Sequence, residues 1–150
     1  MKRSCVVLLT LAALAGCGGT TSTPTETQAA ATTSGHESNA AFSQMTIEQV
    51  AAGLAQGPGA LAVFDANSPA TYAEHHVPTA TWVDYDGVTA EQLPADLAVP
   101  VVFYCANEHC GASHTAAEIA IGLGHSNVSV MGAGIQGWVD AGQPVESATP

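Results

Sequence analysis

Short apolar runs alternate with segments of helical periodicity from Phe42 onward, and this alternation is the feature that most constrains the fold. A short apolar run is typical of a buried strand, and apolar residues three and four positions apart are typical of a helix. Strands that alternate with helices form a parallel sheet with helices on both faces, which is an α/β fold. The pattern predicts strands at residues 61–65, 80–83, 99–104 and 127–131, and helices at 47–54, 68–75, 113–123 and 135–141.

Local signals mark the ends of two of these helices. Thr46, three residues before Gln49, has the form of a capping box. Ser68 followed by Pro69 suits an N-cap and a first helical position. The Gly57-Pro58-Gly59 segment predicts the end of the first helix.

The charge of the chain excludes one class of partner. The 150 residues include 13 acidic and 2 basic side chains, for a net charge of −11, and both basic residues, Lys2 and Arg3, lie at the N-terminus. Binding to nucleic acid requires cationic side chains that neutralise phosphates. Because no Lys or Arg occurs from Ser4 onward, we expect no nucleic-acid partner.

The first 17 residues have the pattern of an export signal. Two cations precede an apolar run that is too short to span a membrane. The run ends in Leu14-Ala15-Gly16-Cys17, which resembles the bacterial lipobox, in which cleavage precedes the Cys and the Cys carries the lipid. We therefore expect residues 1–16 to be a lipoprotein signal peptide and lipidated Cys17 to anchor an exported protein to a membrane of the bacterial cell envelope. A simple signal peptide with an incidental Cys is the alternative.

Composition divides the rest of the chain into a tether, a domain and a tail. After Cys17, residues up to 41 are rich in Thr, Ser and Ala and lack apolar periodicity, which is typical of a flexible tether. Residues 42–147 are long enough for one folded domain, which we expect to be a monomer, and residues 148–150 form a tail.

Several segments of the predicted domain resemble rhodanese-like domains. Asp65 closes a strand, and Tyr72-Ala73-Glu74-His75-His76-Val77-Pro78-Thr79-Ala80 is similar to their Y-x-x-G-H-I-P-G-A segment. Val101-Val102-Phe103-Tyr104-Cys105 looks like the strand that delivers their catalytic Cys. Gly132-Ala133-Gly134-Ile135-Gln136-Gly137-Trp138, followed by Ala141-Gly142-Gln143-Pro144-Val145, is similar to their C-terminal motif. The resemblance spans residues 42–147. It implies an α/β sandwich around a short parallel sheet and sulfurtransferase activity through a persulfide on Cys105.

Two departures from the family pattern concern the active site. Family members often carry an Arg two residues after the Asp, where this chain has Asn67. Their active-site loop is Cys, four variable residues, then Arg or another residue and Ser, whereas the loop from Cys105 to Ser113 is longer and carries no Lys or Arg. The chain looks like a subset of exported rhodanese-like proteins with a second Cys, Cys110, in the loop. A neutral sulfur donor is therefore favoured over thiosulfate.

The predicted position of Cys105, at the carboxyl end of a parallel strand and before a helix, is where α/β folds place ligands. Backbone N–H groups of the loop and the N-terminus of the next helix are expected to stabilise its thiolate and lower its pKa. His109 or His114, when protonated, is a candidate for the missing cation. A buried, inert Cys105 is the alternative. The predicted active-site loop consists of Ala106, Asn107, Glu108, His109, Cys110 and Gly111.

Three roles are open for Cys110. It resolves a sulfenate or persulfide on Cys105, forms a labile disulfide with Cys105 as a redox partner, or takes no part in the chemistry. The two cysteines and nearby histidines have metal-ligand chemistry, but their spacing is not that of a structural zinc site. We expect no metal and no cofactor.

Two functions from different classes fit the sequence. The first is a membrane-anchored sulfurtransferase that moves sulfane sulfur between a small sulfur compound and a thiol acceptor through Cys105. The second is a non-catalytic or redox-sensing envelope binding module on the same fold, suggested by the loop that lacks a cation and by the lipid anchor.

Overall fold

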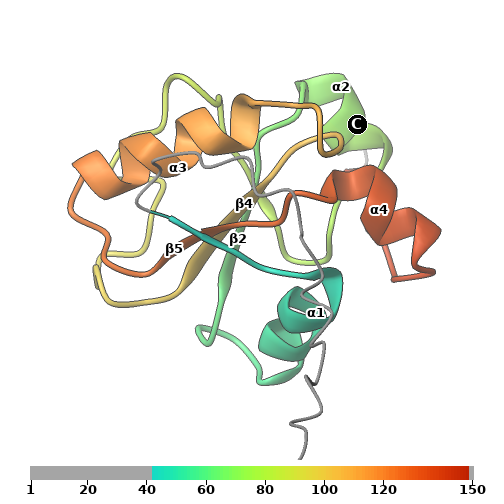
Figure 1. Ribbon diagram of the computed structural model, residues 1–150, viewed down its shortest axis with the longest axis horizontal. Coiled ribbons are helices and arrows are strands. Elements are labelled where there is room, and N and C mark those ends of the chain that lie inside the picture. The colour runs from blue at the N-terminus through green and yellow to red at the C-terminus, as the bar shows by residue number, and fades with distance from the viewer. Residues whose placement is uncertain (1–41, 149–150) are drawn as a thin grey trace, which may run out of the picture. The chain divides into compact units, whose positions relative to one another are not determined.

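The computed structural model describes residues 42–148 and shows a five-stranded sheet in which all paired strands are parallel, in the order β1-β5-β4-β2-β3 (Figure 1). The predicted signal peptide, Cys17 and the tether up to residue 41 lie outside the described residues, as do residues 149–150. The elements in chain order are β1 (Ser43–Gln44), α1 (Ile47–Ala55), β2 (Ala62–Asp65), α2 (Pro69–Glu74), β3 (Thr81–Trp82), β4 (Val101–Tyr104), α3 (Ala112–Gly122), β5 (Val128–Val130) and α4 (Gly134–Asp140).

Strand β4 lies at the centre of the sheet, and all four of its residues are buried. Successive side chains of a strand point to opposite faces, so β4 contributes to two hydrophobic clusters. Val101 and Phe103 belong to the cluster that includes small residues of α3, whereas Val102 and Tyr104 belong to the cluster that includes residues of α1 and α4. Helices therefore cover both faces of a parallel sheet, which confirms the predicted fold class (Figure 1).

The predicted helix starts agree with the structure. Thr46 and Gln49 form the capping box that begins α1, and Ser68 caps α2 with Pro69 in its first turn. Strand β1, in contrast, was not predicted. Its two exposed residues, Ser43 and Gln44, pair with Ser129 and Val130 at the sheet edge. Within residues 42–148 no helix has the length and hydropathy needed to cross a membrane.

Candidate active site

Cys105 directly follows β4, at the carboxyl end of the sheet, as predicted. The backbone of Cys105 and of the residue after it is held by α4. The N–H of Ile135 donates to the carbonyl of Cys105 at 2.9 Å, and the N–H of Gln136 donates to the carbonyl of Ala106 at 3.0 Å. The base of the loop is therefore fixed to the first turn of α4 by two backbone hydrogen bonds.

Glycine at position 134 permits this close approach. Gly134 has a φ of +63°, and a Cβ atom on it would lie 2.5 Å from the carbonyl carbon of Ala106 and 2.6 Å from the nitrogen of Asn107. A side chain at this position would collide with the loop backbone, which cannot yield as a flexible side chain can.

The middle of the loop is a turn that faces solvent. The N–H of Cys110 donates to the carbonyl of Asn107 at 3.0 Å, and the N–H of His109 donates to the side-chain oxygen of Asn107 at 3.0 Å. His109 is 85% exposed at its side chain and lies 3.6 Å from the carboxylate of Glu108. The side chain of His114 instead packs against Phe42. Neither histidine is a hydrogen-bond partner of Cys105, so the predicted histidine cation is not found there.

The sulfur of Cys105 is enclosed, and its residue is 1% exposed. The thiol donates to the carbonyl oxygen of Cys110 at 3.0 Å and lies 3.3 Å from the hydroxyl of Ser113. Burial raises the pKa of Cys105, and the hydrogen bond to the Cys110 side chain adds to this, while Ser113 opposes it. The prediction of a lowered pKa for Cys105 was therefore wrong. The physical reason is burial, because the hydroxyl and backbone N–H of Ser113, which stabilise the thiolate, do not offset the loss of solvent around this sulfur.

Two backbone N–H groups, from Ala106 and Ala112, act on the sulfur of Cys110, whereas the backbone of Ser113 acts on that of Cys105. Burial acts to raise the pKa of Cys110, but hydrogen bonds from the Cys105 thiol and from the N–H groups of Ala106 and Ala112 outweigh it and hold that pKa below its ordinary value. Ala112 is the first residue of α3, where backbone N–H groups have no partner within the helix. Both cysteines are free thiols, and the Cys105 thiol donates to the backbone carbonyl of Cys110.

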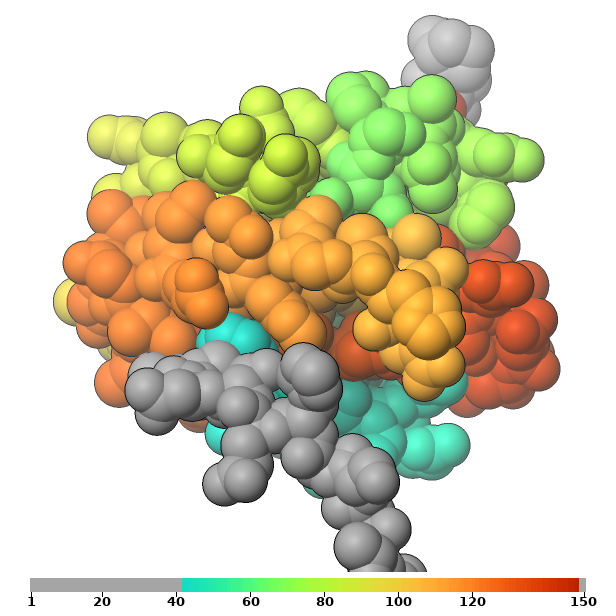
Figure 2. Space-filling model, turned by 45° about the horizontal axis from the view of Figure 1, so that its top comes forward, coloured from blue at the N-terminus to red at the C-terminus, as the bar shows by residue number. Residues whose placement is uncertain are grey.

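Cys110 is half-buried and lines a cavity of about 440 Å³. The cavity opens between the segment that follows β2, the segment that follows β3, and the start of α3. In the space-filling view the loop reaches the surface beside α2 and α4 (Figure 2). Asp84 is the only lining residue with a charged side chain. The lining residues are Ala66, Asn67, Ser68, Pro69, Trp82, Asp84, Tyr85, Cys110 and Ala112.

Asn67, at the position where family members often carry Arg, joins two walls of this cavity. Its carbonyl accepts a hydrogen bond from the indole N–H of Trp82 at 2.8 Å, and its N–H donates to a carboxylate oxygen of Asp65 at 2.7 Å. A second, larger cavity of about 580 Å³ lies elsewhere, between the Gly57-Pro58-Gly59 turn and Pro94. Its lining includes no titratable side chain, whereas the thiol of Cys110 lines the smaller cavity.

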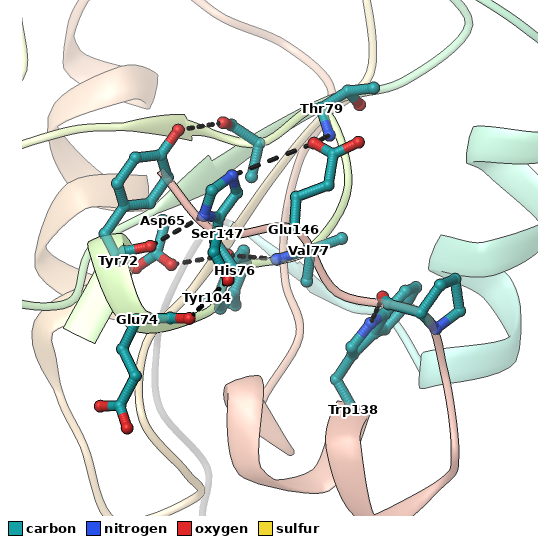
Figure 3. Close-up of polar contacts among 12 residues, drawn as sticks. Asp65, Tyr72, Glu74, His76, Val77, Thr79, Tyr104, Trp138, Glu146 and Ser147 are labelled. Carbon is teal, nitrogen blue, oxygen red and sulfur yellow. Dashed lines mark hydrogen bonds and ion pairs between the residues drawn. The ribbon is translucent and has the colours of Figure 1, made fainter. Parts of the chain in front are cut away.

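A buried polar cluster next to the loop was not predicted as part of the site (Figure 3). The hydroxyl of Tyr104, the residue before Cys105, donates to Asp65 at 2.6 Å and accepts from the N–H of Val77 at 3.0 Å. Burial raises the pKa of Asp65, partly offset by the hydrogen bond from Tyr104. Beside it, the ring of His76 stacks on Tyr72. The sequence signals for this cluster were a polar residue at the end of each of two apolar strands and the family-like segment from Tyr72 to Ala80.

Comparison with known proteins identifies the family. The model of the rhodanese-like domain matches residues 46–141. The chain is 33% identical over 97 residues to thiosulfate sulfurtransferase GlpE of Pseudomonas entomophila (strain L48), a match that covers 65% of this chain and 84% of that protein.

Two solved structures share the fold. The BH2092 protein from Bacillus halodurans has a TM-score of 0.64 at 21% identity, over 71% of this chain and 77% of that one. The rhodanese-like domain of the Alr3790 protein from Anabaena sp. has a TM-score of 0.60 at 19% identity, over 69% of this chain and 78% of that one. The extent of the domain match, together with the sheet order and the cysteine at the end of β4, shows that the chain belongs to the rhodanese-like domain family.

Proposed function

We propose that this domain transfers sulfane sulfur by forming a persulfide on a thiol of the 105–111 loop. The observation that carries the proposal is a pair of free thiols, Cys105 and Cys110, at the carboxyl end of a parallel sheet and beside a cavity. The family and a relative named as a thiosulfate sulfurtransferase support it. The sequence favours Cys105 as the carrier, but the proposal requires only that one of the two thiols carries the sulfur.

The transfer consists of two displacements at sulfur. A loop thiolate attacks the outer sulfur of a donor persulfide, so that a bond from the cysteine to that sulfur forms and the donor leaves as a thiolate. An acceptor thiol or cyanide then attacks the same sulfur, and the cysteine leaves as a thiolate. Atoms and charge balance in each step, and no net oxidation occurs.

The donor that suits this site is a small sulfur compound without a sulfonate or carboxylate. No Lys or Arg occurs from Ser4 onward, and the cavity carries the carboxylate of Asp84. An anionic group on the donor would therefore meet like charge with no cation to offset it. The same shortage of cations supports our expectation that nucleic acid is not a partner.

The test is cyanide-dependent thiocyanate formation by the fully reduced protein, with thiosulfate and with the persulfide of cysteamine as donors. We expect turnover with the persulfide and little with thiosulfate. The Cys105→Ser/Cys110→Ser double variant is the control for spontaneous transfer. Turnover no faster than this control with both donors would overturn the proposal. A partner captured equally well by wild type and by Cys105→Ser would then favour a binding module on the same fold.

We also propose that the protein is exported and held as a monomer on an envelope membrane by lipid on Cys17. The proposal rests on the apolar run that ends in Leu14-Ala15-Gly16-Cys17. Acyl chains add roughly 0.8 kcal/mol of membrane affinity per buried methylene, so a multiply acylated Cys is a firm anchor. Wild type is expected in the detergent phase after phase partition, and Cys17→Ser is expected to be released or unprocessed. Recovery of wild type in the aqueous phase would exclude the anchor.

A further inference from the structure

The two loop thiols differ in their access to the cavity. Cys110 is half-buried and lines the cavity beside Trp82 and Tyr85. Cys105 is 1% exposed and is not among the residues that line it. A donor that enters this cavity therefore meets the sulfur of Cys110 first.

The hydrogen bonds around the two sulfurs also favour Cys110 as the nucleophile. The backbone N–H groups of Ala106 and Ala112 donate to the sulfur of Cys110, and they stabilise a negative charge on it. The proton of the Cys105 thiol is directed to the Cys110 carbonyl, a group that can only accept. Because the thiolate is the nucleophile in sulfur chemistry, the surroundings favour attack by Cys110 and a neutral Cys105 at rest.

We propose that Cys110 takes the sulfane sulfur from the donor and that Cys105 is the resolving thiol, so that, when no external acceptor is present, the reduced protein releases the sulfur as hydrosulfide and closes a Cys105–Cys110 disulfide. This inference rests on the proposed sulfur transfer. It adds which of the two thiols accepts the sulfur and which product the site releases. The roles are the reverse of those that the sequence suggested for the two cysteines.

Each step balances. The Cys110 thiolate attacks the outer sulfur of a hydropersulfide RSSH, forming Cys110–S–SH and releasing RS⁻. The persulfide then ionises to Cys110–S–S⁻. The Cys105 sulfur attacks its inner sulfur, so that the Cys105–Cys110 disulfide bond forms and the bond between the inner and outer sulfurs breaks. The outer sulfur takes the Cys105 proton and leaves as HS⁻. Two thiols are oxidised to a disulfide, and the sulfane sulfur is reduced to sulfide.

The position of the Cys105 thiol supports the second step, because it lies 3.0 Å from the carbonyl oxygen of Cys110 and so beside the residue whose sulfur it must attack. Cysteines five positions apart close a short ring, so the disulfide gains little from loop entropy and is open to exchange. A dithiol reductant returns the protein to its reduced form. The net reaction consumes a persulfide and a dithiol and yields a thiol, hydrosulfide and the oxidised dithiol.

The experiment is a single turnover with the full-length, reduced protein, free of other thiols. An equimolar amount of cysteamine persulfide is added, hydrosulfide is trapped with a fluorogenic alkylating reagent, and free thiols are alkylated. Because Glu108 lies between the two cysteines, cleavage after Glu residues places Cys105 and Cys110 on separate peptides for mass spectrometry. Trypsin would not separate them, since no Lys or Arg occurs in this region.

We expect wild type to release nearly equimolar hydrosulfide and to lose the free thiols of Cys105 and Cys110 to a disulfide. Cys105→Ser should retain one extra sulfur on Cys110 and release no hydrosulfide above the double variant. Cys110→Ser should take up no sulfur on Cys105. Near-ultraviolet circular dichroism checks that each variant is folded. If Cys110→Ser is not folded, prior alkylation of Cys110 in wild type replaces it, and this too should abolish uptake.

The opposite results overturn the assignment in distinguishable ways. An extra sulfur on Cys105 in Cys110→Ser, or after alkylation of Cys110, would show that Cys105 is the acceptor while leaving sulfur transfer intact. A persulfide that stays on Cys110 in wild type, without hydrosulfide release, would remove the resolving role of Cys105. No sulfur on either peptide of wild type would instead overturn the proposed function itself.

Discussion

Tyr104 connects the strand that ends at the site to a buried carboxylate. Its hydroxyl is shared between Asp65, to which it donates, and the N–H of Val77, from which it accepts. Both Tyr104 and Asp65 are fully buried, so the carboxyl oxygen of Asp65 that accepts from Tyr104 depends on this hydroxyl for a polar partner. At the residue scale, the tyrosine before Cys105 is therefore a positioning residue for the end of β4.

Tyr104→Phe should destabilise the domain by about 3 kcal/mol at pH 7, because it leaves a buried carboxylate oxygen and a buried N–H without a partner. Burial already raises the pKa of Asp65, so this group stabilises the fold when protonated and loses that contribution as the pH rises through its raised pKa. Without Tyr104 the pKa of Asp65 rises further, so the cost of the variant should shrink as the pH falls toward about 4, the ordinary carboxyl pKa. Urea unfolding at the two pH values measures this. A cost independent of pH would contradict the coupling between the Tyr104 hydroxyl and the titration of Asp65.

Trp138→Ala should destabilise the domain by roughly 3–5 kcal/mol, the usual cost of removing a large buried aromatic side chain. Trp138 is 1% exposed, packs in the cluster below β4, and donates its indole N–H to the carbonyl of Pro144 at 2.7 Å. Trp138→Phe is the matched control, since it keeps a ring but loses the hydrogen bond, and it should cost less. Equal denaturation midpoints for wild type and Trp138→Ala would contradict this packing role.

At the scale of elements, helix α4 holds the base of the active-site loop through Gly134, Ile135 and Gln136. The loop itself contributes few buried residues and is exposed at Glu108 and His109. The position of the two thiols therefore depends on a neighbouring helix as much as on the loop sequence.

Gly134→Ala should displace the loop, and Gly142→Ala is its matched control. Both glycines have a positive φ, +63° and +70°, so both substitutions carry the backbone strain of about 1–2 kcal/mol. Only at Gly134 does the new Cβ meet the loop backbone, whereas at Gly142 no heavy atom lies within 4 Å. We expect Gly134→Ala to cost about 1–3 kcal/mol more and to reduce sulfur transfer at least tenfold, with Gly142→Ala nearly as active as wild type. Equal activities would mean that the contact with α4 does not position the thiols.

The sequence predicted those elements whose own residues carry a strong pattern. The apolar run at β4 and the caps of α1 and α2 depend on local chemistry, and the structure confirms them. Strand β1 escaped prediction because Ser43 and Gln44 show no apolar pattern, and only pairing with β5 makes them a strand. The position of Cys105 was predictable from the strand before it. The direction of the loop N–H groups was not, since it depends on the path of a loop longer than the family pattern.

At the scale of the whole molecule, negative charge is spread over the domain without opposing Lys or Arg. All the charged side chains after Ser4, apart from histidines, are acidic, so together they repel an approaching anion. The carboxylate of Asp84 lies at the cavity itself. Such a field lowers the local concentration of anions and slows their association, and it weakens as salt is added.

Two persulfides of similar size test this effect, one from cysteamine and one from 2-mercaptoethanesulfonate, because they differ mainly in an ammonium against a sulfonate group. We expect kcat/KM to favour the cysteamine persulfide by about tenfold or more at low ionic strength. The preference should shrink at about 1 M salt, where the screening length falls to about 3 Å.

Asp84→Asn should reduce the preference for the cysteamine persulfide more than Glu118→Gln does. The latter removes the same unit of charge from an exposed position on α3 that does not line the cavity. Equal reductions would assign the preference to the net charge of the domain alone. Equal kcat/KM values for the two donors at low salt would show that the charge of the domain does not select the donor.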